Sequence, residues 1–173
     1  PNKRDMHVIG RAAWHSTRGC RAAFLLCGLL AAHSASACAL VLSEQRTGRV
    51  AATWPAHSTP VRLNVSFEHS VLGTTVRDSY EMRWDATQWR AHLIEETFAG
   101  EGYGLPYGPQ AGEQMVRTAT GWRLTLDRVI HPLVLLPLPE QNARITFGER
   151  TVHLASLSRK SLAVGLQDCA APP

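Results

Sequence analysis

The sequence predicts an all-β fold, either a small antiparallel β-sandwich or an open barrel of about seven to eight strands, preceded by a helical signal segment. Two observations support this prediction. From Ala39 onward, short runs of alternating apolar and polar residues are separated by Gly, Pro, Asn and Asp. None of these runs has the periodicity of an amphipathic helix of useful length. The first 37 residues follow a different pattern, and the roughly 136 that remain are enough to bury a core.

The first 37 residues have the order of a secretory signal. Arg18 and Arg21 precede an apolar run at residues 22–32. Ala35 and Ala37 then form an A-x-A site, so we expect cleavage after Ala37. An uncleaved membrane span is the alternative, but it would need about 20 residues and would include polar side chains. The expected location is therefore periplasmic or otherwise exported, with membrane attachment only through an uncleaved or lipidated N-terminus.

The signal segment also accounts for the net charge. Residues 1–37 hold five of the 18 Lys and Arg side chains and one of the 14 Asp and Glu side chains, so 13 of each sign remain. The mature domain is formally neutral, and its basic residues are scattered among acidic ones. Nucleic-acid-binding domains usually cluster Lys and Arg on one face, so we predict no nucleic-acid partner.

Cys38 and Cys169 lie near opposite ends of the mature chain. In an oxidising compartment they can form a disulfide, provided that the fold brings the two ends together. The alternative is lipidation of Cys38, which directly follows small residues but has Ala35 where a lipobox has Leu or a similar residue. The two fates exclude each other, because an acylated Cys38 cannot pair with Cys169.

Alternation indicates one β domain over residues 38–160, followed by a C-terminal tail over 161–173. Residues 98–113 are rich in Gly and Pro and are predicted to form a long loop, which in a compact domain is either functional or disordered. The predicted strands are 39–43, 48–53, 61–71, 76–84, 89–96, 114–120 and 122–129, followed by an apolar run at 133–139 and a hairpin over 144–157 with its turn near Gly148 and Glu149.

The hairpin over residues 67–80 carries polar residues on its apolar face. If its loop is 72–75, Val71 faces Val76 and His69 lies opposite Asp78. An imidazole and a carboxylate would then be within reach of each other on the core side. Pairing would satisfy both groups, which are costly to bury alone.

Two interpretations of this pair are open. In the functional one, Asp78 orients His69 and raises its basicity, leaving the other ring nitrogen to bind a ligand or move a proton. In the structural one, the pair fixes the register of a half-buried sheet. Ser70 does not complete a catalytic triad, because neighbours in a strand point to opposite faces.

Tyr103 and Tyr107 lie on the long loop and are predicted to be exposed contact residues. The histidines of the mature chain are dispersed and no paired-cysteine spacing occurs, so we predict no metal site and no cofactor. The predicted binding residues are His69, Ser70, Asp78, Tyr80, Tyr103 and Tyr107.

Several short motifs resemble one family. They are the sequence HSV at 69–71, Thr74, Asp78 and Tyr80, the following Trp84 or Trp89, and F-x-x-x-GYGLP at 98–106. Together they resemble the domain-of-unknown-function family 1850, with similarity over about residues 38–157. The chain departs from the family pattern at Leu72, where an acid is common, and at Asp78, where Glu is more usual. The first departure weakens the case for a shared carboxylate site.

The resemblance implies a small exported bacterial protein, often encoded beside TRAP transporters of the TAXI type, and it transfers no catalytic residue. We therefore expect a non-enzymatic accessory or ligand- or partner-binding domain, linked to such a solute transporter. Two alternatives are a small hydrolase or proton-transfer enzyme that uses His69 and Asp78, and a structural protein of the cell envelope.

Overall fold

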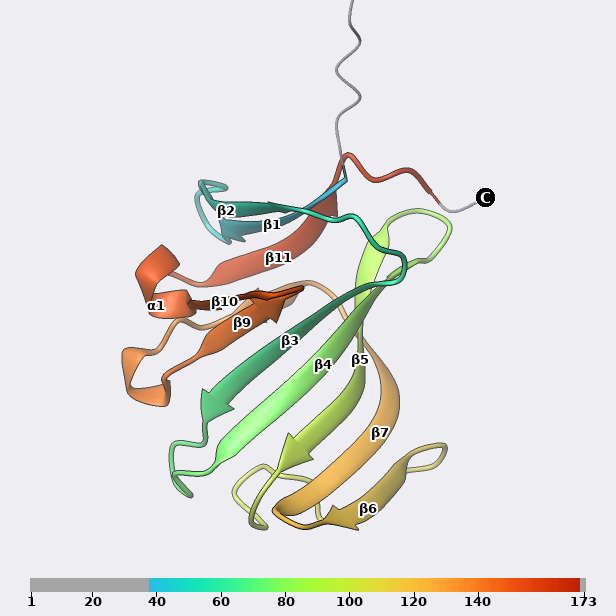
Figure 1. The fold of residues 1–173 in the computed structure, drawn as a ribbon, viewed down its shortest axis with the longest axis vertical. Helices are drawn as coiled ribbons and strands as arrows, with labels where there is room; N and C mark the ends of the chain where they lie inside the picture. The colour runs from blue at the N-terminus through green and yellow to red at the C-terminus, as the bar shows by residue number, and fades with distance from the viewer. Residues whose placement is uncertain (1–37, 172–173) are drawn as a thin grey trace, which may run out of the picture. The chain divides into compact units, whose positions relative to one another are not determined.

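The computed structural model describes residues 38–171, which form two antiparallel β-sheets (Figure 1). The predicted signal segment and its cleavage site after Ala37 lie outside the described residues. In the part of the chain that the structure describes, no helix is long and apolar enough to cross a membrane. The all-β class predicted from alternation is confirmed, and the architecture resembles a sandwich with no closed barrel.

The smaller sheet has four strands in the order β2-β1-β11-β8. The larger sheet has seven strands in the order β10-β9-β3-β4-β5-β7-β6. The strands are β1 (Ala39–Glu44), β2 (Val50–Pro55), β3 (Val61–Glu68), β4 (Thr75–Trp84), β5 (Trp89–Phe98), β6 (Gln114–Thr118), β7 (Gly121–Ile130), β8 (Leu133–Leu135), β9 (Arg144–Phe147), β10 (Arg150–His153) and β11 (Leu162–Gln167). Two short helical turns complete the described elements, η1 (Pro139–Gln141) and α1 (Leu154–Leu157).

The C-terminal segment differs from its prediction. Residues 161–173 were expected to be a tail, but β11 pairs with both β1 and β8 and so lies inside the smaller sheet. Its apolar side chains explain this position, since Leu162 is fully buried and Val164 is 8% exposed. The hairpin predicted over 144–157 also ends early, because its last four residues form α1, with Leu154 buried. The described strands therefore number eleven rather than the expected seven to eight.

The core consists of apolar side chains from both sheets. One or two leucines on each of β1, β3, β7 and β11 are completely or almost completely inaccessible to solvent, because strand alternation turns them inward; they are Leu40, Leu42, Leu63, Leu124 and Leu162. The loop between β5 and β6 also contributes, since its Leu105 is only 7% exposed and belongs to the same core cluster. The largest fully buried side chains are Leu40, Leu42, Leu63, Val76, Leu124, Ile145, Leu154 and Leu162.

A buried carboxylate links the β1–β2 turn to the segment that precedes β11. The side chain of Glu44, at the end of β1, is 3% exposed and accepts hydrogen bonds from Arg49 (2.5 Å), Thr47 (2.6 Å), Ser158 (2.9 Å) and Lys160 (3.0 Å). These donors, Arg49 above all, hold the pKa of Glu44 well below its usual range. The β1–β2 turn is thereby fixed to the segment that leads into β11.

A disulfide connects Cys38 to Cys169 across 131 positions of sequence, with their Cα atoms 4.2 Å apart. The pairing of β1 with β11 explains why the two ends meet, because Ala39 lies opposite Gln167 in an antiparallel ladder. In the structure Cys38 is therefore bonded to Cys169, which is the first of the two fates considered from the sequence.

Removing this disulfide is expected to destabilise the domain, because the bond closes a very long loop in the unfolded chain. The double variant Cys38→Ser/Cys169→Ser should lose about 2–5 kcal/mol of unfolding free energy, measured by urea denaturation. Reductant should shift the wild type towards the double variant and leave the double variant unchanged. Coincident unfolding curves for the oxidised wild type and the double variant would contradict this prediction.

Candidate functional site

The register of β3 with β4 places the predicted site residues. Val65 lies opposite Asp78, and Phe67 lies opposite Val76. The predicted register, with Val71 facing Val76, is therefore wrong by four positions. The physical reason is a longer loop over 69–74, closed by hydrogen bonds from His69 N–H to the Thr74 carbonyl (2.8 Å) and from Gly73 N–H to the His69 carbonyl (2.8 Å). The even shift keeps the residues of β3 and β4 on their expected faces, but it separates His69 from Asp78.

His69 contacts backbone groups on both sides of its ring. Its Nδ1 accepts from the N–H groups of Val71 and Leu72, both at 3.3 Å. Its Nε2 lies 3.1 Å from the carbonyl oxygen of Tyr103. Because Nδ1 accepts, the neutral ring carries its proton on Nε2 and donates it to Tyr103. Both nitrogens are therefore engaged, and His69 joins its own loop to the β5–β6 loop.

The loops 69–74 and 99–113, hereafter the loop pair, contact each other at two further points. Thr74 Oγ1 donates to the carbonyl oxygen of Ala99 (2.8 Å). Leu72 packs over Gly100, where an added Cβ would lie 2.9 Å from Leu72 Cδ1. Gly100 has a φ of +98°, which glycine adopts without strain. The glycine-rich sequence thus lets the two loops approach closely.

The far end of loop 99–113 is anchored to β7. Glu113 accepts hydrogen bonds from the Nε of Arg128 (2.7 Å) and from the backbone N–H of Gln110 (2.9 Å). These contacts and the burial of Leu105 hold the loop against the sheet. The sequence alone does not decide whether this long loop is functional or disordered. Loop 99–113 is therefore an ordered part of the described domain.

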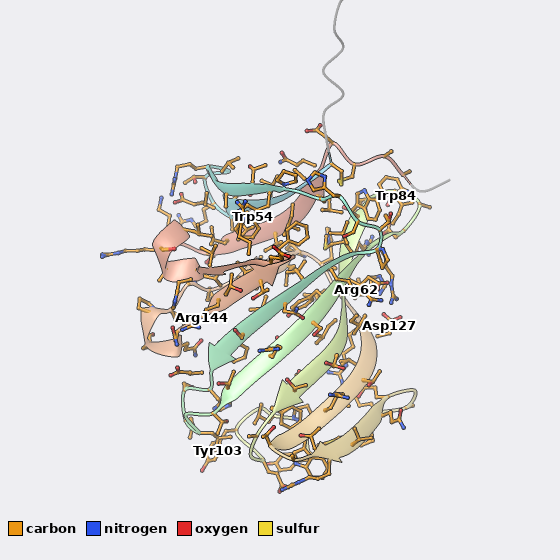
Figure 2. The ribbon with its side chains drawn as sticks, in the orientation of Figure 1. Trp54, Arg62, Trp84, Tyr103, Asp127 and Arg144 are labelled. Atoms are coloured by element: carbon orange, nitrogen blue, oxygen red, sulfur yellow. A yellow bond between two sulfur atoms is a disulfide. The ribbon has the colours of Figure 1, made fainter. Side chains whose placement is uncertain are left out.

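The loop pair exposes large side chains to solvent. Val71 is 60% exposed, Tyr103 69% and Tyr107 82%, and Ser70 is exposed beside Val71. Tyr107 Oη lies close to Gly102, where an added Cβ would be 2.9 Å away. Figure 2 shows Tyr103 at the end of the domain remote from β1 and β2. Four of the six predicted binding residues, namely His69, Ser70, Tyr103 and Tyr107, thus lie together on the loop pair.

Asp78 and Tyr80 lie elsewhere, on the inner face of β4. Tyr80 donates its hydroxyl to Asp78 Oδ2 (3.2 Å), while Asp78 Oδ1 is buried and has no hydrogen-bond partner. Glu96 lies opposite Asp78 in the β4–β5 ladder. Burial raises the pKa of Asp78 to about 6, and burial together with the charge of Asp78 raises the pKa of Glu96 to about 7.

The structure does contain a histidine–aspartate pair, but it is His92 with Asp127. His92 Nδ1 lies 2.7 Å from Asp127 Oδ1, and Arg83 donates to Asp127 Oδ2 at 2.7 Å. The pair could not be predicted from the sequence, because β6 separates the two strands along the chain and alternation does not show that β5 pairs with β7. The only available signal was that both residues lie on the polar faces of their predicted strands.

The His92–Asp127 pair belongs to a ladder of charges on the outer face of the larger sheet. Arg83 also donates to Glu81 (2.7 Å), which accepts from Arg62 on β3 (2.8 Å). Asp127 is 57% exposed in this ladder. Oppositely charged neighbours on one face stabilise adjacent strands, which accounts for the arrangement. Within residues 38–171, no group of three or more His, Cys, Asp or Glu side chains is placed to hold a metal ion.

Comparison with known proteins gives one family. The model of the domain of unknown function DUF1850 matches residues 63–154, a span that includes the loop pair, Asp78 and Glu96. No curated protein and no solved structure matches the chain.

From the half-buried carboxyl groups of Asp78 and Glu96 we predict a specific pH dependence of stability. The folded-state pKa of Asp78, about 6, lies above its ordinary value of 3.8, so this group stabilises the fold at low pH and loses that contribution as pH rises through about 6. Asp78→Asn should therefore gain stability relative to the wild type between pH 4 and pH 8, by up to about 3 kcal/mol. Urea denaturation across this pH range measures the difference in unfolding free energy between Asp78→Asn and the wild type. Glu96→Gln should likewise gain unfolding free energy relative to the wild type as pH rises. A difference that is independent of pH would contradict the prediction.

Proposed function

The chain belongs to the DUF1850 family, and from that premise we propose that it is an exported, non-catalytic accessory domain that binds a protein partner through the loop pair. One observation carries the proposal: Val71, Tyr103 and Tyr107 are exposed on loops that are held together by hydrogen bonds and packing. Exposed large side chains on ordered loops of a rigid scaffold are typical of contact surfaces.

The chemistry of the exposed residues fits protein recognition. Tyrosine presents a large contact area with little conformational freedom to lose, and it is enriched among the residues that dominate binding energies. The loops are also fixed before any partner arrives, because His69 and Thr74 bond to the backbone of loop 99–113. Such preorganisation lowers the entropy lost on binding.

The engaged state of His69 supports a non-catalytic role. A general base needs a free ring nitrogen within reach of the proton that it removes. Both nitrogens of His69 contact backbone groups, and Asp78 is not its partner. The alternative function, a hydrolase or proton-transfer enzyme that uses His69 and Asp78, therefore has no observation in its favour at these two residues.

Location and partner follow from two further considerations. A disulfide between Cys38 and Cys169 is stable in an oxidising compartment, which supports an exported, periplasmic domain. The resemblance of the chain to proteins encoded beside TAXI-type TRAP transporters makes a component of such a transporter the first partner to test. An accessory role in solute uptake is the proposed consequence.

Affinity capture tests the proposal. The exported form of the protein is immobilised and incubated with detergent-solubilised membranes and periplasmic extract from cells that contain a TAXI-type TRAP transporter. We expect the wild type to retain a transporter component and Tyr103→Ala/Tyr107→Ala to retain at least about tenfold less.

The matched control replaces exposed valines outside the loop pair. Val50→Ala and Val129→Ala each alter a side chain that is 51% exposed, on β2 and β7 respectively. Both should retain as much transporter component as the wild type. Recovery of no transporter component by the wild type, or equal recovery by the tyrosine double variant, would contradict the proposal and favour a structural role in the envelope.

A further inference from the structure

A second potential binding site lies on the inner face of the larger sheet, away from the loop pair. A pocket of about 260 Å³ has Asp78 and Tyr80 in its wall. The remainder of the wall is mostly aliphatic and aromatic, with contributions from β3, from the end of β7 and from β8. An engineered apolar cavity of about 150 Å³ holds benzene, so this pocket has room for one ring and a short chain.

The polar part of the pocket is incompletely paired. Asp78 Oδ2 accepts one hydrogen bond, from Tyr80, and Asp78 Oδ1 is covered from solvent without a partner. A buried carboxylate oxygen with no donor is unfavourable by a few kcal/mol in an apolar environment. A positive charge bound in the pocket beside this carboxylate would offset part of this penalty through its electrostatic attraction.

The charges around Asp78 decide what kind of donor fits. Glu96 lies opposite Asp78 in the neighbouring strand and adds negative charge. Arg128, whose charge lowers the pKa of Glu96, is already paired with Glu113. The carboxyl groups of Asp78 and Glu96 therefore favour the binding of a positively charged ligand and disfavour the binding of an anion.

We propose that this pocket binds a small apolar primary amine, whose ammonium group lies beside the carboxylate of Asp78 while its hydrocarbon body contacts Val65, Phe67, Leu133 and Leu135. The size of the pocket selects an arylalkyl or short alkyl amine. This site is independent of the loop pair and does not rest on the proposed partner binding.

Calorimetric titration with three probes of matched shape tests the proposal. 2-Phenylethylamine, 2-phenylethanol and phenylacetate share a ring and a short chain but differ in charge. At pH 8 the carboxyl of Asp78 is ionised, since burial raises its pKa only to about 6. We expect the amine to bind at least about tenfold more tightly than the alcohol, and phenylacetate not to bind.

Variants assign the preference to the pocket. Asp78→Asn should bring the amine and the alcohol to equal affinity, while Tyr80→Phe, which keeps the carboxylate, should retain the preference for the amine. Val134→Phe places a larger side chain in the pocket wall and should weaken the binding of both the amine and the alcohol. This variant tests the location of the site if Asp78→Asn does not fold. Tyr103→Ala/Tyr107→Ala should bind the amine as the wild type does, so failure here is distinguishable from failure of partner binding.

Three outcomes would overturn the proposal. The first is equal affinity of the wild type for the amine and the alcohol. The second is a preference for the amine that survives in Asp78→Asn. The third is a set of ligand-induced NMR shift changes centred on the cleft beside Trp54 and Phe147 instead of on Val65 and Leu133. That cleft, of about 820 Å³, is lined by Arg62, Glu149 and Arg150, so its basic side chains outnumber its acidic one and it favours a cation less than the pocket at Asp78 does.

Discussion

The pairing of β3 with β4 is the constraint on which the candidate sites depend. With Val65 opposite Asp78, alternation directs Asp78 and Tyr80 to the inner face. The same register leaves residues 69–74 outside the ladder, free to fold into a loop that reaches the β5–β6 connection. One set of backbone hydrogen bonds therefore places both an exposed loop and a half-buried acidic group.

The two sheets are unequal, and this inequality explains why loop 99–113 is ordered. Strands β4, β5 and β7 are ten residues long, and Figure 1 shows them extending beyond the four-stranded sheet. Apolar side chains in that extension need another cover. Leu105 supplies part of it from the loop, and the Glu113–Arg128 ion pair, with atoms 2.5 Å apart, fixes the end of the loop to β7. The ordered tyrosines are thus a consequence of how the sheet is covered.

Alternation was enough to predict the β class, the faces of β3 and β4, and the loop at 98–113, because these depend on local sequence and burial. Register was not predictable, since Val71 and Phe67 are equally acceptable apolar partners for Val76. The choice between them is made by the hydrogen bonds of His69 and Gly73 within the loop. Long-range strand pairing was equally unpredictable from the sequence, because the partners of β11 and of His92 lie far away along the chain. Residues 161–173 were therefore interpreted as a tail, and His92 as a dispersed histidine.

Backbone NMR measures the register of β3 and β4 in solution. We expect cross-strand nuclear Overhauser contacts that link Val65 with Asp78 and Leu63 with Tyr80, together with a His69 ring protonated on Nε2. Cross-strand contacts that link His69 with Asp78 and Val71 with Val76 would contradict this register, because they would place His69 in the sheet and release loop 99–113 from its contact with the imidazole.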